Sequence, residues 1–319
     1  MTVEESAPPR IAAVGLASWD RLLVVERYPK PGEYVVVRND ISAPGGTTTN
    51  TAIALARLGA VVRVAAYVGD DAHGAAIRDG LERADVDTTW LATRVGQPTD
   101  ASTIVVSHDP LDRTIYWHQG AQIVRGDRLD IAALFAHDLV IVDVADAPLR
   151  RFLVDLPAHT LPGVRLLGTL TYLVDAGVQD ALELALRHDV IVGNEREILS
   201  LTGTWTIADA IAALQSQMPG HTLRACVVSR GSLGCRLFTA TERWQVPAFK
   251  VDVVDPTGAG DAFTAGVAYG LARRWDYPAI GRFANACGAL ATRALGAQST
   301  LPTMEEITTL MASGEEIDQ

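Results

Sequence analysis

The residues best suited to chemistry lie at positions 253–263, with the sequence VVDPTGAGDAF. Gly258 and Gly260 carry no side chain, so successive backbone N–H groups there can point toward one anion. A helix expected to begin near Asp261 would add its positive end. A carboxylate beside an anion site could accept a proton from an attacking hydroxyl during phosphoryl transfer. An isolated Gly-x-Gly-Asp is more often a turn with a helix cap, so the other motifs must decide.

Two polar clusters precede helical patterns in the first third of the chain. Residues 11–15 are an apolar run typical of a buried strand, and Asp20 follows at the edge where open α/β sheets bind ligands. Gly45 and Gly46 would let the backbone approach a ligand, and Asn50 offers both a donor and an acceptor. The same residues would also make a plain glycine turn and a capped helix.

Polar residues also follow apolar runs in the second half of the chain. Asp146, Asn194 and Ser229 each stand at or just beyond such a run, and Glu197 lies one helical turn past Asn194. The carboxyl ends of parallel strands meet at one edge of a sheet, so these side chains could share a site. Helix capping alone would explain most of them.

The elements that position these residues are predicted from periodicity. Between residues 129 and 192, apolar runs alternate with helical patterns, which indicates a parallel sheet with helices on both faces. Two β-rich pairs interrupt this rhythm, at 22–26 with 34–37 and at 102–107 with 114–118. A small sheet made from these segments would be a natural lid over a site.

Composition limits the classes of protein. The 319 residues are 48% hydrophobic and 20% charged, which predicts an ordered chain of one large domain with an appendage, or of two domains. A net charge of −11 argues against nucleic acid or an anionic membrane as a partner. Three cysteines without a Cys-x-x-Cys pair, no export signal and no long apolar stretch predict a cytoplasmic protein without a disulfide framework.

Taken in order, these motifs resemble the ribokinase family of carbohydrate kinases, also called the PfkB family, from about residue 11 to residue 302. Neither a Walker phosphate loop nor a complete Gly-x-Gly-x-x-Gly is present, so the P-loop and Rossmann alternatives lose their main support. The resemblance rests on five short motifs, which are Gly45-Gly46 with Asn50, Asn194-x-x-Glu197, Ser229-x-Gly231-x-x-Gly234, Asp255-x-Thr257-Gly258-Ala259-Gly260-Asp261, and Gly296-Ala297.

The resemblance implies a ribokinase-like three-layer α/β/α sandwich with a mostly parallel central sheet and a small β lid. The kinase domain would span 11–319, with the lid formed by inserts at about 21–40 and 100–119. The implied activity is that of an ATP-dependent sugar kinase. Asp261 would take the proton of the sugar hydroxyl that attacks the γ-phosphate of ATP. The anion hole would be the backbone of Gly258, Ala259 and Gly260.

The resemblance also implies how ligands are bound. Sugar hydroxyls would be held by Asp20, Gly45, Gly46, Asn50 and Asp146. ATP would contact Asn194, Ser229, Gly231, Gly234 and Asn285. Mg²⁺ keeps several waters in protein sites, and Glu197 would act on it through them. K⁺ or another monovalent cation beside the anion hole would meet Asp255, Thr257, Ala291, Ala294, Gly296 and Thr300.

Some residues depart from the family pattern. Thr47-Thr48-Thr49 stands where ribokinases proper usually have Lys-Gly-Ala, which weakens ribose as the substrate without favouring another sugar. Pro256 and Ser229 each stand where a threonine is usual. Both keep the backbone or hydroxyl group that the site needs, so we expect neither change to abolish activity.

Several alternatives stay open on the sequence. A nucleoside kinase of the same fold would present similar ribose contacts, and a non-catalytic sugar-binding protein could share the fold. Trp117 and His118 could be substrate contacts, although such residues on an amphipathic strand more often pack. An apolar lid face predicts a homodimer. A phosphorylated sugar is disfavoured because the lid segments hold few cations, namely Arg21, Arg27, Lys30, Arg38 and Arg113.

Overall fold

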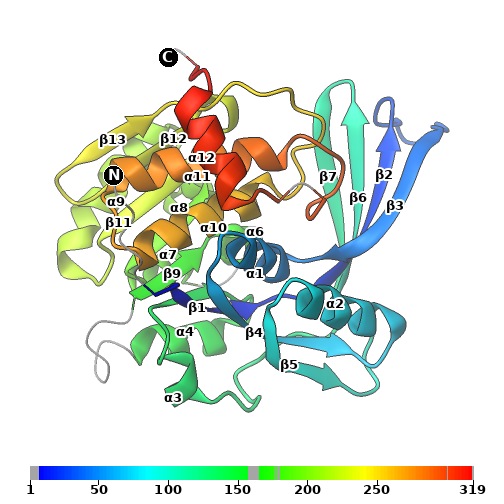
Figure 1. Ribbon diagram of the computed structural model, residues 1–319, viewed down its shortest axis with the longest axis horizontal. Coiled ribbons are helices and arrows are strands. Elements are labelled where there is room, and N and C mark those ends of the chain that lie inside the picture. The colour runs from blue at the N-terminus through cyan, green and yellow to red at the C-terminus, as the bar shows by residue number, and fades with distance from the viewer. Residues whose placement is uncertain (1–6, 157–164, 176, 178–179, 300, 318–319) are drawn as a thin grey trace.

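A large sheet forms the centre of the computed structural model, which describes residues 7–156, 165–175, 177, 180–299 and 301–317 (Figure 1). Within these residues the sheet has nine strands in the order β13-β12-β11-β10-β9-β8-β1-β4-β5. The seven strands from β11 to β5 run parallel, and β12 and β13 add an antiparallel edge. The strands are β1 (Arg10–Gly15), β4 (Val61–Gly69), β5 (Asp87–Arg94), β8 (Leu139–Asp143), β9 (Arg165–Thr169), β10 (Val190–Asn194), β11 (Ala225–Ser229), β12 (Cys235–Phe238) and β13 (Arg243–Val246).

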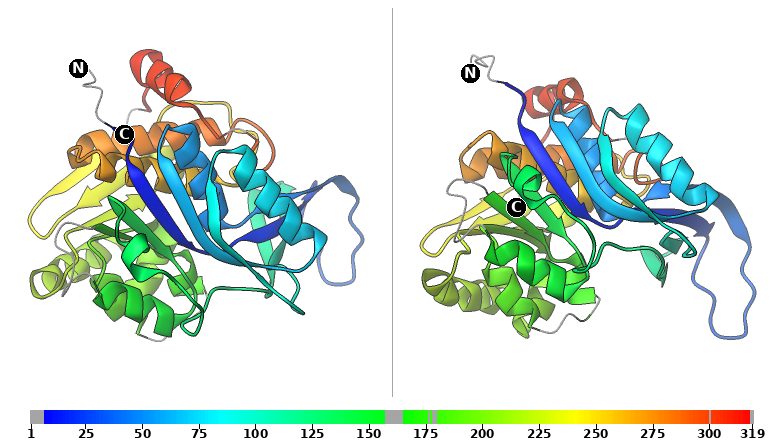
Figure 2. Two further views of the ribbon diagram at one scale, coloured as in Figure 1. Left: turned by 60° about the horizontal axis from the view of Figure 1, so that its bottom comes forward. Right: turned by 90° about the horizontal axis from the view of Figure 1, so that it is seen from below.

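Helices cover both faces of this sheet (Figure 2). Alternate strand residues serve the two layers: Ile11 and Ala13 of β1 pack into one apolar cluster, while Ala12 and Val14 pack into the other. One layer holds α1 (Thr47–Arg57), α2 (Ala72–Arg83), α10 (Ala259–Ala272), α11 (Tyr277–Ala291) and α12 (Met304–Ser313). The other holds α3 (Ile131–Leu134), α4 (Ala147–Asp155), α6 (Thr171–Asp175), α7 (Ala181–Leu186), α8 (Glu195–Thr202) and α9 (Ile207–Gln217).

A second, four-stranded sheet stands at the right of the molecule in Figure 1, in the order β3-β2-β6-β7. Its central strands β2 and β6 run parallel, whereas β3 and β7 pair antiparallel with them. Leu22, Ile104 and Val106 form its small apolar cluster. The strands are β2 (Ser18–Val25), β3 (Val37–Gly45), β6 (Ala101–His108) and β7 (Leu111–His118). The predicted fold class, a three-layer sandwich with a mostly parallel sheet and a small β lid, is confirmed.

One strand of the small sheet was wrongly placed by the sequence pattern. The prediction put it at 34–37, but residues 34–36 lie outside any strand and β3 runs from Val37 to Gly45. This strand is mostly exposed along its length and carries charged and polar residues, so it lacks the apolar alternation that marks a half-buried strand. Pairing with β2, rather than its own pattern, makes it a strand.

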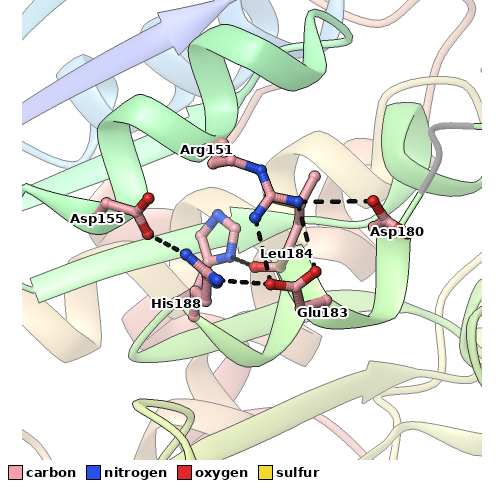
Figure 3. A network of polar contacts seen from close by, with 7 residues as sticks. Arg151, Asp155, Asp180, Glu183, Leu184 and His188 are labelled. Carbon is pink, nitrogen blue, oxygen red and sulfur yellow. Dashed lines mark hydrogen bonds and ion pairs between the residues drawn. The ribbon is translucent and has the colours of Figure 1, made fainter.

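Helices α4 and α7 are joined at the surface by ion pairs (Figure 3). Arg151 lies 3.2 Å from Glu183 and 3.7 Å from Asp180, and Arg187 contacts both Glu183 and Asp155. The paired side chains are 32–54% exposed, so solvent screens each pair and its contribution to stability is small. The pairs therefore set the relative position of the two helices more than they stabilise the fold.

A buried histidine lies directly beneath this network. His188 is fully buried, its Nδ1 atom is 2.9 Å from the Leu184 carbonyl, and its ring packs against Gly168 of β9. Burial, with a smaller effect from the Arg150 cation, lowers the pKa of His188 to about 3. The ring is therefore neutral in the folded protein at physiological pH. It fills the space that a side chain at position 168 of β9 would need.

We predict that Gly168→Ala destabilises the protein, because its Cβ atom would stand 2.5 Å from the His188 ring. Overpacking of this kind costs about 1–3 kcal/mol and should lower the urea midpoint of unfolding. Gly126→Ala is the matched control, since nothing lies within 4 Å of the added atom. Equal midpoints for the two variants would contradict the tight contact between β9 and His188.

Candidate active site

A pocket of about 740 Å³ lies between the inner face of the small sheet and the carboxyl ends of the large sheet. Strands β2, β6 and β7 form one wall, and residues from α1, α8, α10 and the ends of β9 to β11 form the rest. Of the predicted site residues, those that line it are Asp20, Gly46, Asn50, Asn194, Glu197, Ser229, Thr257, Gly258, Gly260 and Asp261. The structure therefore gathers residues from all parts of the chain at one place.

Asp261 lies in the first turn of α10 and is oriented by an amide from α1. Asn50 Nδ2 donates to Asp261 Oδ2 at 2.8 Å, and Gln298 Nε2 donates to Asn50 Oδ1 at 2.9 Å. Both polar atoms of the Asn50 amide are thus engaged, which fixes its orientation. Asn50 was predicted as a sugar contact, and what the structure shows is that its amide holds the carboxylate of Asp261.

The helix that carries Asp261 begins with a residue that must be glycine. Gly258 is the N-cap of α10, with φ of 81°, and a Cβ atom there would lie 2.6 Å from the Cα atom of Ala297. The N–H of Ala259 donates to the Pro256 carbonyl at 3.2 Å. Gly260 has open space around it and lines the pocket. The loop is therefore tight at Gly258 and open to a ligand at Gly260.

The environment of Asp261 favours its neutral form. Burial raises its pKa to about 7, and the charges of Asp143 and Asp20 act in the same direction. The hydrogen bond from Asn50 and the cation of Arg113 oppose this rise. A carboxyl group with a pKa near 7 is suited to take up a proton at physiological pH.

Asp20 lies on β2 against the glycine pair. It is 8% exposed, and burial together with the charge of Asp100 raises its pKa to about 7, against a hydrogen bond from the Gly46 backbone. A Cβ atom on Gly45 would lie 2.0 Å from Asp20 Oδ2. Gly45 does not line the pocket. Its lack of a side chain makes room for this carboxylate.

Asp100, which was not predicted as a site residue, anchors the aromatic wall of the pocket. It is fully buried and accepts hydrogen bonds from Trp117 Nε1 at 2.9 Å, Gln122 Nε2 at 2.9 Å and the Gly120 N–H at 3.2 Å. Trp117 then faces Tyr172, with 6.0 Å between ring centroids, and both line the pocket. Its neighbour His118 is exposed, bonds Thr103 on the same sheet and does not line the pocket.

Asp143 at the end of β8 is a second residue that sequence analysis did not assign to the site. It is buried and accepts hydrogen bonds from the hydroxyls of Thr47, Thr48 and Thr169. Burial raises its pKa. Thr47 and Thr169 line the pocket, so the threonine run that departs from the family pattern connects this carboxylate to the pocket wall.

The predicted sugar contact Asp146 lies away from the pocket. It is the N-cap of α4, where its Oδ1 atom accepts from the Leu149 N–H at 2.7 Å and the Arg125 N–H at 3.2 Å. It is absent from the pocket lining. The structure therefore does not bring Asp146 together with the other predicted sugar contacts. Asp143, three residues earlier, instead contacts the lining residues Thr47 and Thr169.

The pocket lining also includes the Asn194 and Glu197 motif. The two residues form a capping box at the start of α8, with the Glu197 N–H donating to Asn194 Oδ1 at 2.9 Å and the Asn194 N–H to Glu197 Oε2 at 3.0 Å. Thr171 donates to Glu197 Oε1 at 3.2 Å. Arg196, between them in sequence, also lines the pocket and was not predicted.

Three predicted nucleotide contacts lie outside the pocket lining. Gly231 and Gly234 belong to the turn after β11, where φ is 57° and 75°. Asn285 is buried on α11 and donates to the carbonyls of Val246 and Pro247 at 3.1 and 2.8 Å. Of the predicted nucleotide contacts, Asn194 and Ser229 are the ones that line the pocket.

The predicted monovalent cation residues are partly gathered by Asp255. It is fully buried and accepts from the Thr257 N–H at 2.9 Å, the Thr257 hydroxyl at 2.7 Å and the Gly296 N–H at 2.8 Å. Ala291 ends α11 and Ala294 follows in the same connection, while Thr300 lies outside the described residues. Within the described part of the chain no cluster of three or more His, Cys, Asp or Glu side chains could bind a metal ion.

Comparison with known proteins gives a consistent result. Residues 8–304 match the model of the pfkB family carbohydrate kinases. The chain is 28% identical over 314 residues to ribokinase from Bacillus subtilis, covering 95% of this chain and 99% of that protein. It is 28% identical over 295 residues to probable fructokinase-4 from Arabidopsis thaliana, covering 85% and 88%. The structure of Arabidopsis thaliana ribokinase complexed with ribose and ATP matches with a TM-score of 0.78 at 25% identity, covering 95% and 99%.

We predict that Asp261→Asn stabilises the protein, and that the gain is larger at pH 8 than at pH 5. The raised pKa means that the folded state binds this proton more tightly than the unfolded chain, so the contribution of Asp261 to stability is lost as pH rises toward 7. Thermal unfolding midpoints of both proteins at the two pH values test this. A gain that is equal at both values, or absent, would contradict the raised pKa of Asp261.

Proposed function

The chain belongs to the pfkB family of carbohydrate kinases, and on that premise we propose how its pocket transfers the γ-phosphate of ATP to a hydroxyl of a free sugar. The observation that carries the proposal is the hydrogen bond from Asn50 to Asp261, beside the glycine loop at the start of α10. It holds a carboxylate of raised pKa at the positive end of a fourteen-residue helix. A proton acceptor and an anion site then lie side by side.

In this proposal Asp261 is the general base. Its carboxylate takes the proton of the sugar hydroxyl while the hydroxyl oxygen attacks the γ-phosphorus, and the bond to the bridging oxygen of ADP breaks. The backbone N–H groups of Gly258, Ala259 and Gly260 stabilise the charge on the transferred group. The N–H of Ala259 must first break its hydrogen bond to the Pro256 carbonyl, so a small movement of this loop accompanies phosphate binding.

Asp20 and Asn50 are the residues that we assign to the sugar hydroxyls. Thr47 and Thr169 join them, because their hydroxyls donate to Asp143 and leave oxygen lone pairs for a donor in the pocket. Trp117 supplies a flat apolar surface at the same end. Gly45 and Gly46 act by allowing the close approach of Asp20 and β2 to α1.

The nucleotide and its ions would occupy the end of the pocket near α8. Mg²⁺ fits a site of this kind because Glu197 and Asn194 already hold each other in place, so a hydrated ion would meet a rigid acceptor. The ion would supply charge neutralisation of the phosphates. Ser229, Gly231, Gly234 and Asn285 are retained as the proposed surroundings of ATP. The proposed K⁺ site is the loop that Asp255 ties to Gly296, with Thr257, Ala291, Ala294 and Thr300.

A free sugar is favoured over a phosphorylated one by the distribution of lid cations. Arg21 pairs with Asp40 and Arg27 with Glu33, at distances of 2.7 Å, and neither lines the pocket. Lys30 and Arg38 are also outside the pocket lining, so among the described lid residues Arg113 is the one cation that reaches it. The sugar end is acidic instead, through Asp20, Asp100 and Asp143.

We also propose that two chains pair through their small sheets. Strands β3 and β7 are the outer strands of that sheet, and Val37, Ile115 and Tyr116 on them are 44, 52 and 58% exposed. No described helix is long and apolar enough to cross a membrane. With ATP as substrate, the cytoplasm is the proposed compartment. Light scattering at micromolar concentration distinguishes a dimer from the monomer that would contradict this pairing.

The proposed activity is tested by measuring ADP formation from magnesium-ATP with pentoses, hexoses, sugar phosphates and nucleosides, with and without K⁺. Turnover with one free sugar supports the proposal and identifies the substrate. A preference for a nucleoside would show that the phosphate acceptor is a nucleoside rather than a free sugar. Tight sugar binding without turnover across the panel would indicate a non-catalytic sugar-binding protein.

We predict that Asp261→Asn lowers kcat by a factor of about 10²–10⁴, the range that general base catalysis contributes. Binding of ATP and sugar, measured by calorimetry, should change little because the amide keeps the size of the side chain. Asp79→Asn, at an exposed position of α2, is the matched control. Near-normal turnover in Asp261→Asn would rule out this residue as the base.

We predict that Trp117→Phe raises KM for the sugar by about tenfold, which corresponds to a loss of about 1.4 kcal/mol, with little change in KM for ATP. The phenyl ring cannot donate to Asp100, so the aromatic wall loses its anchor and a buried carboxylate loses a donor. Trp205→Phe is the control, since Trp205 is 95% exposed. An unchanged sugar KM would show that Trp117 does not contact the acceptor.

A further inference from the structure

Arg113 pairs with no described carboxylate, whereas the lid cations Arg21 and Arg27 pair with Asp40 and Glu33. Among the described residues its guanidinium makes one hydrogen bond, from Nη1 to the Pro256 carbonyl at 3.4 Å, and forms no ion pair. Four acidic residues, Asp20, Asp112, Glu197 and Asp261, line the same pocket. Asp112 Oδ1 accepts from the backbone N–H of Arg113 at 2.7 Å. Most of the five N–H donors of the guanidinium are therefore available to a ligand.

Arg113 lies beside the glycine loop at the start of α10. It lies on β7, in the wall opposite α10, and its partner Pro256 stands two residues before the N-cap Gly258. Gly258, Gly260 and Arg113 all line the pocket. The contact joins residues 143 positions apart in the sequence and is a contact between the small sheet and the glycine loop.

The chemistry of a guanidinium fits the group that is transferred at this place. Its planar fork donates paired hydrogen bonds to phosphate oxygens, and it stays charged at all physiological pH values. During phosphoryl transfer, negative charge spreads over the three equatorial oxygens of the γ-phosphoryl group. The carbonyl of Pro256 is a weak, neutral partner at 3.4 Å, which the guanidinium can exchange for an anion.

On the basis of the function proposed above, we propose that Arg113 is a catalytic residue that donates hydrogen bonds to the transferred phosphoryl group. The backbone of the glycine loop would bind this group from one side and Arg113 from the other. Because Arg113 is carried by β7, the small sheet then contributes directly to the chemical step as well as covering the pocket. The proton still passes from the sugar hydroxyl to Asp261, and ADP leaves as before.

The proposal is tested by the kinetics of Arg113→Met and Arg113→Lys, with Arg27→Ala as the control. Arg27 is an exposed lid cation paired with Glu33, outside the pocket lining. We expect Arg113→Met to lower kcat by a factor of about 10²–10³, as for the loss of a donor to a transition-state anion. KM for the sugar should change less than threefold, Arg113→Lys should recover part of kcat, and Arg27→Ala should match the wild type.

The pH profile gives a second readout that a purely structural role would not move. Asp261 is surrounded by Asn50, Asp143, Arg113 and Asp20, and of these the Arg113 cation opposes protonation of Asp261. Removing the cation should therefore move the acidic limb of kcat/KM to higher pH in Arg113→Met, and the limb should stay in place in Arg27→Ala.

The outcomes separate this inference from the proposed function. A wild-type enzyme that is active on a sugar, with Arg113→Met equally active or impaired only in KM for the sugar, would reject the role of Arg113 alone. A wild-type enzyme inactive toward all acceptors would reject the proposed function, and the role of Arg113 with it. A loss of kcat together with a shifted acidic limb supports both.

Discussion

The pocket depends on four carboxylates that are held close together by neutral donors. Asp20, Asp100, Asp143 and Asp261 lie at its proposed sugar end, and none of them forms an ion pair with another described residue. Amide, indole, hydroxyl and backbone N–H groups bind them instead. A cation would keep each carboxylate ionised and occupied, whereas neutral donors leave it able to exchange a proton or a hydroxyl partner. Burial raises the pKa of all four carboxylates. Placing them together therefore costs folding free energy, and their protonation can respond to a bound polyol.

The small sheet and the body of the protein meet at these same residues. Strand β2 begins three residues after β1 ends, and β3 leads almost directly into α1. Ser18 pairs with Gly45 at this junction, and Asp20 pairs with Ala43. The proposed sugar contacts therefore lie at the root of the small sheet, where any change in its angle to the body alters the pocket. Arg113 lies farther along the sheet, beside the glycine loop. A change in the angle of the small sheet would therefore move both Arg113 and the proposed sugar contacts.

The sequence was informative where function depends on backbone geometry and short motifs. The glycine loop, the helix after it and the capping box at Asn194 are local, and each was placed correctly in the fold. The family assignment and the fold class, which were predicted from five such motifs in order along the chain, are confirmed by the family match and the structural likeness. The roles of the individual site residues remain predictions that the variants described above can test.

The sequence was least informative where a role comes from packing between distant segments. Asp100 and Asp143 follow no motif, and their importance arises from Trp117, Thr47 and Thr169, which other strands and helices bring to them. Asp146 was predicted as a sugar contact from the family resemblance, but the start of α4 uses Asp146 as its cap. Strand β3 was missed because its residues are polar and exposed. It is a strand because it pairs with β2.

The order of strands in the large sheet has a consequence for synthesis of the chain. Beyond β1, the strands β8 to β13 lie next to one another in the order in which a ribosome makes them, so each new strand can cover the edge left by the previous one. The sheet can grow outward without leaving a long edge exposed to other chains. Asp261 and its supporting Gln298 come only after the last of these strands. On the role proposed for Asp261, a nascent chain cannot transfer phosphate from ATP until nearly all of it has left the ribosome.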